Sequence, residues 1–328
     1  MATLQSLIDA VNTVSDIVPS NLVSPPAPPM QFADDGVVNP PAGGFSAVYA
    51  FGDSLSDAGN VSALTLRNVP VSPPYAGGVF SNGPVWVQQL SQEFGLPPVK
   101  ASLTGGTDYA YGGARTGAIP GYTPNPSDLP SQLGQFAANV PNPSADALYT
   151  VWIGANDMLD VANDTSLTAE QRSASVQQAV SNEVGFVNNL ISLGAQHVMV
   201  LNLPNLGQTP YEVQRGPDVA AQATATAQEY NTLLADQLQD VVATSGVDLQ
   251  LVDTFTFLDT AIATPGAYGL TNVTDPLWTG NITDPNSGTL QASGDAQAGY
   301  LFFDTLHPSG TAHALLAATI ADQVSVPA

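Results

Sequence analysis

The chain has 328 residues, and its 28 acidic and 5 basic side chains give a formal net charge of −23. Such a surface repels phosphate backbones, which excludes nucleic-acid binding through counterion release. Cysteine is absent, which excludes disulfides, thiolate nucleophiles and cysteine-ligated metal sites. Hydrophobic residues make up 44% of the chain, enough for a buried core, and no run of roughly 18 apolar residues predicts a membrane span.

The N-terminal part differs in composition from the rest. Residues 2–17 carry apolar side chains at helical spacing, and residues 19–41 are rich in proline. The start lacks the basic and apolar segments of a signal peptide. We therefore expect a helix and an extended arm over residues 1–44, followed by one domain over residues 45–328.

Apolar strand-like runs alternate with amphipathic helical patterns along the remaining chain. The predicted strands are 46–54, 147–154, 197–204 and 248–253, with a weaker one at 99–103. The predicted helices are 84–94, 169–193, 219–242 and 309–324. This alternation indicates an α/β fold with parallel strands, helices on both faces of the sheet and a ligand crevice at the carboxyl ends of the strands. Glycine- and threonine-rich residues 264–299 predict a long loop over that crevice.

Ser54 directly follows the first apolar strand, in the string GDSLSDAGN. Small residues around it indicate a turn from a strand into a helix, which exposes a hydroxyl and a backbone N–H together. A serine hydroxyl becomes a strong nucleophile only when a neighbouring base takes its proton. The prediction therefore requires a histidine within reach.

Three histidines are available in the whole chain. His197 opens a predicted strand and is expected at the end of the sheet remote from Ser54, while His313 lies inside the last helix, where a packing or surface role is expected. His307 lies in a loop, in the string FFDTLHPSG, and Asp304 precedes it by three residues. A carboxylate so close can accept the ring proton, fix the tautomer and stabilise the imidazolium. This pair is the predicted acid–base unit.

Attack on an ester creates an oxyanion, which needs preorganised hydrogen-bond donors. Asn156 follows an apolar strand in VWIGANDML, and its amide is one candidate. Gly112 and Gly113 in DYAYGGARTG are others, because a missing Cβ lets a backbone N–H approach the substrate closely.

The strings FGDSLSDAGN, YGGARTG, GAND and DTLHP, in this order, resemble the four sequence blocks of the GDSL or SGNH hydrolase superfamily. The resemblance extends from Phe51 to Pro308. The segment PPYAGGVFSNGPVWVQQL is also similar to the secreted lipase and esterase branch, which includes plant GDSL esterases and bacterial autotransporter esterase passengers. The resemblance implies a three-layer α/β/α sandwich with a flavodoxin-like sheet of five parallel strands, and no metal or organic cofactor.

Carried over block by block, the resemblance implies that the catalytic residues are Ser54 as nucleophile and His307 as base, oriented by Asp304. It implies an oxyanion hole made by the N–H groups of Ser54 and Gly113 and the Asn156 side chain; the choice of Gly113 over Gly112 depends on register. Asp53 and Asp57 would orient the turn. The expected reaction is carboxylic-ester hydrolysis through an acyl-serine intermediate.

The substrate is left open by the sequence. Short to medium acyl or aryl esters are favoured, because apolar side chains are available for an acyl pocket: Val79, Phe80, Tyr111, Ile119, Tyr122, Trp278, Leu301 and Phe302. The alternatives are a carbohydrate O-acetylesterase, a (lyso)phospholipase and a non-catalytic binding or adhesion module that keeps the fold. We expect a secreted or cell-surface protein of bacterial origin, and interpret the Asn-x-Ser/Thr sequons, including the one at Asn60, as chance.

Overall fold

The computed structural model describes residues 40–41 and 44–324. The helix predicted over residues 2–17 and most of the proline-rich arm lie outside the described residues. The division into residues 1–44 and 45–328 therefore stays a prediction.

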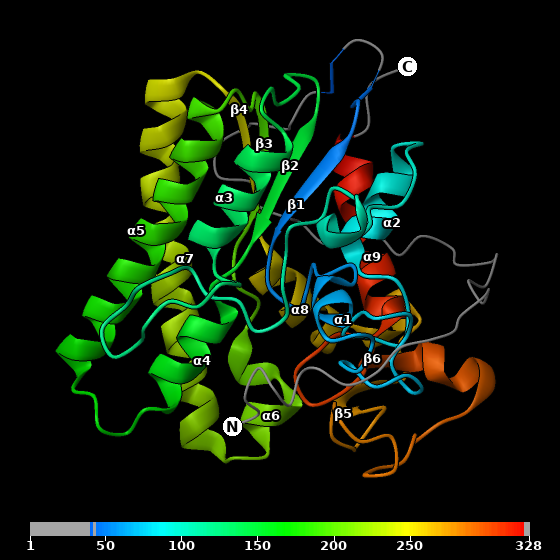
Figure 1. Cartoon of the computed structure of the whole chain (residues 1–328). Helices are drawn as coiled ribbons and strands as arrows, with labels where there is room; N and C mark the ends of the chain where they lie inside the picture. Colours follow the sequence, from blue (N-terminus) through cyan, green and yellow to red (C-terminus); the bar gives the residue numbers. More distant parts are fainter. Residues whose placement is uncertain (1–39, 42–43, 325–328) are drawn as a thin grey trace.

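The central sheet has four parallel strands in chain order (Figure 1). They are β1 (Val48–Gly52), β2 (Leu148–Trp152), β3 (His197–Leu201) and β4 (Asp248–Val252). They pair without a register shift, so that their first residues lie side by side and their last residues meet at one edge. The four strong strand predictions are confirmed.

Successive side chains of each strand point to opposite faces of the sheet, and both faces are covered (Figure 1). On one face, Phe51, Val151 and Val200 belong to the core shared with helices α3, α4, α5 and α7. On the other, Ala50 and Met199 belong to the core shared with α2, α8 and α9. The helix bounds are α2 (Trp86–Glu93), α3 (Leu129–Asn139), α4 (Ala155–Asn163), α5 (Ala169–Ser192), α7 (Pro217–Ser245), α8 (Thr254–Ala263) and α9 (Gly310–Val324). This is the predicted α/β/α sandwich.

The four predicted helices are confirmed as α2, α5, α7 and α9, and local signals set their ends. Thr168 caps α5: its hydroxyl accepts a hydrogen bond from the Gln171 N–H, and the Gln171 side chain accepts one from the Thr168 N–H. Helix α7 begins at Pro217, whose missing N–H is not needed in a first turn, and ends at Gly246 with φ of 68°.

The prediction of a fifth strand at 99–103 is wrong. In this stretch only Ala101 forms a bridge, and residues Ser102–Thr104 form the 3₁₀ helix η2. The fifth position beside β1 is instead taken by residues 107–111, which exchange backbone hydrogen bonds with Ala50 and Gly52. They form an isolated bridge at Asp108 and no strand, and the Asp108 carboxylate accepts hydrogen bonds from the N–H groups of Ala58 and Ala110.

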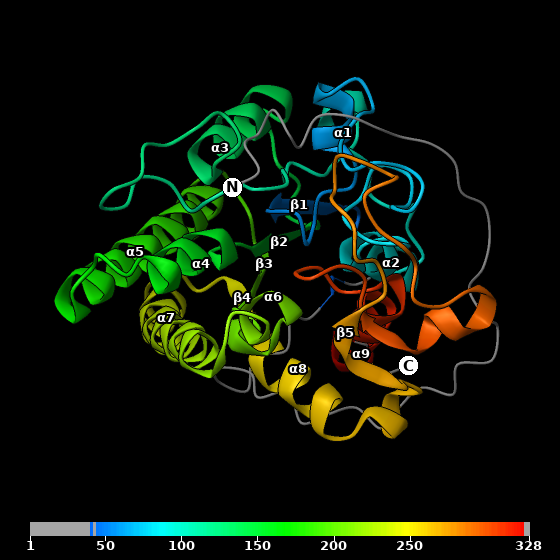
Figure 2. The same cartoon turned by 90° about the horizontal axis from the view of Figure 1, so that it is seen from below.

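The predicted long loop at 264–299 is also partly wrong. It contains η4 (Pro265–Tyr268), β5 (Asn272–Pro276) and η5 (Gly294–Gly299), and β5 pairs in parallel with β6 (Tyr300–Phe302) in a second, two-stranded sheet. Figure 2 shows this part of the chain beside α8 and α9. The sequence does not predict strand β5 because most of its residues are polar and only Pro276 is buried. The helices α3, α4 and α8 were also not predicted. Nor were three shorter elements: α1 (Asn60–Leu64), η3 (Leu206–Gln208) and α6 (Pro210–Val213).

Candidate active site

Ser54 lies two residues beyond β1, at the carboxyl edge of the sheet. Gln132 holds the strand end: its side chain accepts a hydrogen bond from the Gly52 N–H at 2.9 Å and donates one to the Gly52 carbonyl at 2.8 Å. A Cβ on Gly52 would lie 2.1 Å from the Trp152 carbonyl oxygen, so only glycine fits there. The Asp53 carbonyl then accepts backbone N–H groups of the next turn, which fixes the path of the chain through Ser54.

A continuous chain of hydrogen bonds joins Ser54, His307 and Asp304. His307 Nε2 lies 2.9 Å from Ser54 Oγ, and His307 Nδ1 lies 2.8 Å from Asp304 Oδ2. An ionised carboxylate only accepts hydrogen bonds, so Nδ1 carries the proton and Nε2 accepts the Ser54 hydroxyl proton. The structure therefore brings together the three side chains that the sequence predicts as catalytic, with the histidine in the tautomer that general-base catalysis needs.

The two ionisable members of this chain stabilise each other's charged forms. Burial alone would lower the pKa of His307, but the Asp304 charge and hydrogen bond, with a contribution from Asp53, raise it above its ordinary value. Burial also opposes ionisation of Asp304. The His307 charge and the hydrogen bonds that the Asp304 carboxylate accepts nevertheless hold the pKa of Asp304 below its ordinary value. Asp304 thus stays ionised while His307 changes charge.

The other two histidines lie where the sequence predicts. His197 begins β3 at the opposite end of the sheet, where its Nδ1 lies 3.1 Å from Asp248 Oδ2. His313 is buried in α9, and its Nδ1 accepts a hydrogen bond from the Trp86 N–H. Burial, with a smaller effect of His307, lowers the pKa of His313 to about 3, so this ring is neutral and has a packing role.

Three potential donors face the Ser54 hydroxyl from the same pocket, which Ser54, Gly113 and Asn156 all line. Within residues 44–324, the N–H groups of Ser54 and Gly113 have no acceptor. The Gly112 N–H is instead bound to Asp57 Oδ2 at 2.8 Å. The Asn156 amide donates one of its two protons to the Ala114 carbonyl, which leaves the other for a ligand. The Gly113 N–H, and not the Gly112 N–H, is thus available to a ligand in this pocket. The oxyanion hole itself stays a prediction.

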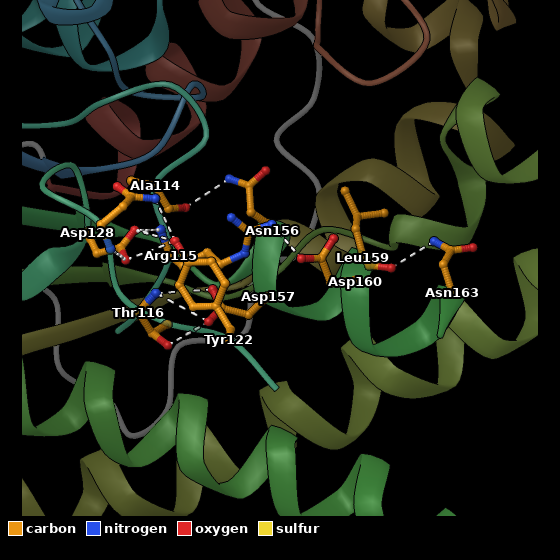
Figure 3. A network of polar contacts seen from close by, with 11 residues as sticks. Ala114, Arg115, Thr116, Tyr122, Asp128, Asn156, Asp157, Leu159, Asp160 and Asn163 are labelled. Carbon is orange, nitrogen blue, oxygen red and sulfur yellow. Dashed lines mark hydrogen bonds and ion pairs between the residues drawn. The ribbon is translucent and has the colours of Figure 1, made fainter. Parts of the chain in front are cut away.

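A network of polar contacts holds the Gly113 loop against the helix that carries Asn156 (Figure 3). Arg115 pairs with Asp160 of α4 at 2.5 Å and lies over the Tyr122 ring, 4.4 Å from its centre. Asp157, also on α4, accepts hydrogen bonds from the N–H and hydroxyl of Thr116 at 3.1 and 2.8 Å. These contacts hold the loop against the N-terminal part of α4, and so position Gly113 relative to Asn156.

Two side chains near Ser54 position the site without taking part in the chemistry. Asp57, to which the prediction assigns no chemistry, accepts the N–H groups of Gly59, Asn60 and Val61 besides that of Gly112, and so ties the Ser54 turn to the glycine loop. The Asn60 amide is fully buried and donates to the carbonyls of Asp108 and Ala110. This burial agrees with the interpretation of the Asn60 sequon as chance.

Two pockets meet at Ser54 and His307. The apolar pocket has a volume of about 80 Å³, lies beyond the carboxyl ends of β2–β4, and has these apolar side chains in its wall: Trp152, Leu159, Leu206, Phe257, Leu258, Leu301, Phe302 and Leu316. The polar pocket has a volume of about 370 Å³, and its wall includes Tyr75, Phe80, Arg115, Asn125, Ile282 and Thr305. Among residues 44–324, no group of three or more histidine or carboxylate side chains is arranged to hold a metal ion.

Of the eight apolar side chains predicted to line an acyl pocket, three line a pocket. Leu301 and Phe302 line the apolar pocket, and Phe80 lines the polar pocket, with its ring 5.4 Å from that of His307. The prediction is wrong for five side chains that line neither pocket: Val79, Tyr111, Ile119, Tyr122 and Trp278. All five pack in the protein interior or against it, because hydrophobicity alone does not distinguish a core side chain from a pocket side chain.

Three carboxyl groups behind Ser54 give a stability prediction. Burial raises the pKa of Asp53 and Asp157 to about 7 and that of Glu183 to about 8. In an unfolded chain such groups lose their protons near pH 4, at about their ordinary pKa values. Between about pH 4 and 8 the folded state therefore binds more protons than the unfolded state, and stability falls as the pH rises. We expect a higher melting temperature at pH 5.5 than at pH 8.

Scanning calorimetry at the two pH values tests this expectation. Glu183→Gln should reduce the difference, because it removes one of the buried titrating groups. Glu170→Gln is the matched control, since Glu170 is fully exposed. A melting temperature that is equal or lower at pH 5.5 would contradict the assignment of these carboxyls as protonated.

Comparison with known proteins agrees with this geometry. Residues 48–320 match the profile of the family described as GDSL-like Lipase/Acylhydrolase. A phosphatidylcholine-sterol acyltransferase of Aeromonas hydrophila is 32% identical over 77% of this chain and 71% of its own length. An acetylesterase of Thermothelomyces thermophilus is 28% identical over 83% of this chain and 86% of its own. An Arabidopsis thaliana GDSL esterase/lipase is 26% identical over 83% of this chain and 85% of its own length.

The family match covers all four sequence blocks and every element from β1 to most of α9. These three relatives are named as enzymes that act on esters or transfer acyl groups, whereas another Arabidopsis thaliana relative, 24% identical over 79% of this chain and 67% of its own length, is named an inactive GDSL esterase/lipase-like protein. The names alone therefore do not decide against the predicted alternative of a non-catalytic module, but the hydrogen-bond chain from Ser54 to Asp304 counts against it. The chain belongs to the GDSL-like lipase/acylhydrolase family, and it is an α/β serine hydrolase of carboxylic esters.

Proposed function

We propose that Ser54 attacks the ester carbonyl while His307 takes its proton, and that Asp304 orients and stabilises the imidazolium. The oxyanion would be bound by the N–H groups of Ser54 and Gly113 and by the Asn156 amide. His307 then protonates the leaving alcohol, and a water molecule that it activates releases the acid from Ser54. The single observation that carries this proposal is the unbroken hydrogen-bond chain from Ser54 Oγ to Asp304.

The wall of the apolar pocket supports a short to medium acyl or aryl group. Beside Ser54 and His307 this wall is made mainly of apolar side chains, among them Trp152, Phe257 and Leu301. Such a wall stabilises an aliphatic or aromatic group by removing its surface from water.

The larger polar pocket would receive the alcohol part of the ester. Arg115, Asn125 and Thr305 in its wall offer hydrogen bonds that an aliphatic chain does not use. This wall supports a polar alcohol, for which a carbohydrate acetate and a lysophospholipid are the two alternatives on the same catalytic residues. The relatives named acetylesterase and phosphatidylcholine-sterol acyltransferase correspond to these two chemistries.

We also propose that the protein is secreted or displayed at a cell surface. The composition supports this proposal, because only 5 of the 328 residues are basic. Within residues 44–324, no helix is long and apolar enough to cross a bilayer.

Hydrolysis of p-nitrophenyl esters from acetyl to palmitoyl tests the acyl pocket. We expect kcat/KM to be higher for short and medium acyl chains than for palmitoyl, because the proposed acyl group lies in the apolar pocket beside Ser54. Leu159→Trp fills the pocket from α4, so it should lower the octanoyl rate about tenfold or more and leave the acetyl rate within about threefold.

Leu133→Trp is the matched control, because Leu133 is another half-buried helical leucine that lines neither pocket. If Leu159→Trp and Leu133→Trp give the same chain-length profile, the apolar pocket does not hold the acyl group. Turnover of acetylated glycans or lysophospholipids, but of no p-nitrophenyl ester above acetyl, would replace the medium-chain proposal with the corresponding alternative.

A further inference from the structure

Tyr75 lies beside the candidate active site without having been predicted there. Its side chain is 2% exposed, and its ring packs edge-on against Phe303 at 4.7 Å, with 83° between the ring planes. Tyr75 and Phe303 share a small apolar cluster with Val71, Leu277 and Trp278. Because Phe303 directly precedes Asp304, this cluster fixes the ring of Tyr75 next to the Asp304 carboxylate.

The Tyr75 hydroxyl donates a hydrogen bond to Asp304 Oδ2 at 2.6 Å. This is the same oxygen that accepts the His307 Nδ1 proton at 2.8 Å. The other oxygen, Oδ1, accepts the backbone N–H groups of Leu306 and His307 at 2.8 and 2.7 Å. Each carboxylate oxygen thus has two donors, which is the full acceptor capacity of the group.

The four donors have different effects. The two backbone N–H groups hold Oδ1 within the turn that leads to His307. Without the Tyr75 hydroxyl, Oδ2 would keep His307 Nδ1 as its single donor, so the direction of this oxygen would be held by one hydrogen bond in place of two. Burial and the neighbouring Asp304 charge raise the pKa of Tyr75 well above its ordinary value, so its hydroxyl keeps the proton that it donates.

We propose that Tyr75 is a positioning residue of the reaction, which acts through Asp304 by fixing the direction of its Oδ2 and sharing its negative charge. This inference rests on the proposed function of Ser54, His307 and Asp304. The hydroxyl touches no substrate atom in this role. It sets the strength of the Asp304–His307 hydrogen bond, and thereby both the orientation of the imidazole and the pH at which the imidazole gains a proton.

Tyr75→Phe tests this role, because phenylalanine keeps the ring packing against Phe303 and removes only the hydroxyl. We expect kcat for p-nitrophenyl butyrate to fall about tenfold with KM little changed, since a less well oriented imidazole slows proton transfer from Ser54 without touching the substrate. The acid limb of the kcat/KM profile should move upwards by about half a pH unit, because the unshared Asp304 charge stabilises the imidazolium more strongly.

Tyr149→Phe is the matched control. Tyr149 is also fully buried and its hydroxyl also donates one short hydrogen bond, to the Ser144 carbonyl at 2.7 Å, but it lies in β2 away from both pockets. This variant should keep the wild-type kcat and pH profile. In a background that already carries Asp304→Ala, Tyr75→Phe should cause no further loss, since a residue that acts through Asp304 has nothing left to act on.

Three results would overturn the role of Tyr75: a wild-type kcat and pH profile in Tyr75→Phe, an equal loss in the Asp304→Ala background, or a loss of activity with an unshifted acid limb. A structural effect alone would give the last result together with a lower melting temperature. If the wild-type chain hydrolyses no ester, the proposed function fails and this inference with it. If the wild type is active and Tyr75→Phe matches it, only the inference about Tyr75 fails.

Discussion

Ser54→Ala and His307→Ala should each lower kcat for a p-nitrophenyl ester by about 10⁴- to 10⁶-fold. The first removes the nucleophile, and the second removes the base that lies 2.9 Å from it. Because the two groups act as one unit, the double variant should have nearly the same kcat as the slower of the two single variants. Stopped-flow and long-time steady-state assays measure rates over this range.

His197→Ala is the matched control for the loss of a histidine. His197 also pairs with an aspartate, Asp248, but at the opposite end of the sheet, so its replacement should leave kcat unchanged. A Ser54→Ala variant that keeps wild-type turnover would remove Ser54 as the nucleophile. The ester hydrolysis would then need another group in the two pockets.

Asn156→Ala should lower kcat by about 10²- to 10³-fold with little change in KM. One N–H of the Asn156 amide donates a hydrogen bond to the Ala114 carbonyl. The other is available in the pocket that Asn156 lines with Ser54 and Gly113, where the oxyanion is expected. A hydrogen bond to the ester carbonyl oxygen is stronger in the transition state than in the ground state, because the negative charge on this oxygen develops only in the transition state. The measurement is a full kcat and KM determination on a soluble butyrate ester.

Asn189→Ala serves as the control, since this asparagine is exposed on α5 and donates only to the Gly185 carbonyl of its own helix. If Asn156→Ala raises KM and leaves kcat unchanged, Asn156 binds the ground state and is not part of an oxyanion hole. A fall in melting temperature with unchanged kcat would show that its bond to Ala114 is its main role.

Much of the fold follows from patterns that are local in the sequence. Mainly apolar runs of strand length predict β1 to β3, since parallel strands buried on both faces need no alternation of polar and apolar residues. In β4, Leu249 and Leu251 alternate with polar residues, which also indicates a strand. The candidate catalytic side chains could be predicted for a related reason. Ser54 follows a strand, and Asp304 lies three residues before His307, a separation short enough for the turn between them to bring carboxylate and ring together.

The sequence by itself determined the α/β class, the order of the four motif blocks and the chemistry available to Ser54, His307 and Asp304. Tertiary structure alone decided three further features: that Gly113 and not Gly112 keeps a free N–H, because Asp57 binds the latter; that residues 107–111 and not 99–103 lie beside β1; and that Tyr75 bonds to Asp304, 229 residues away. Each depends on contacts between segments far apart in the chain. Local propensity carries no information on such contacts, because their energy comes from burial and hydrogen bonding that exist only once the chain has folded.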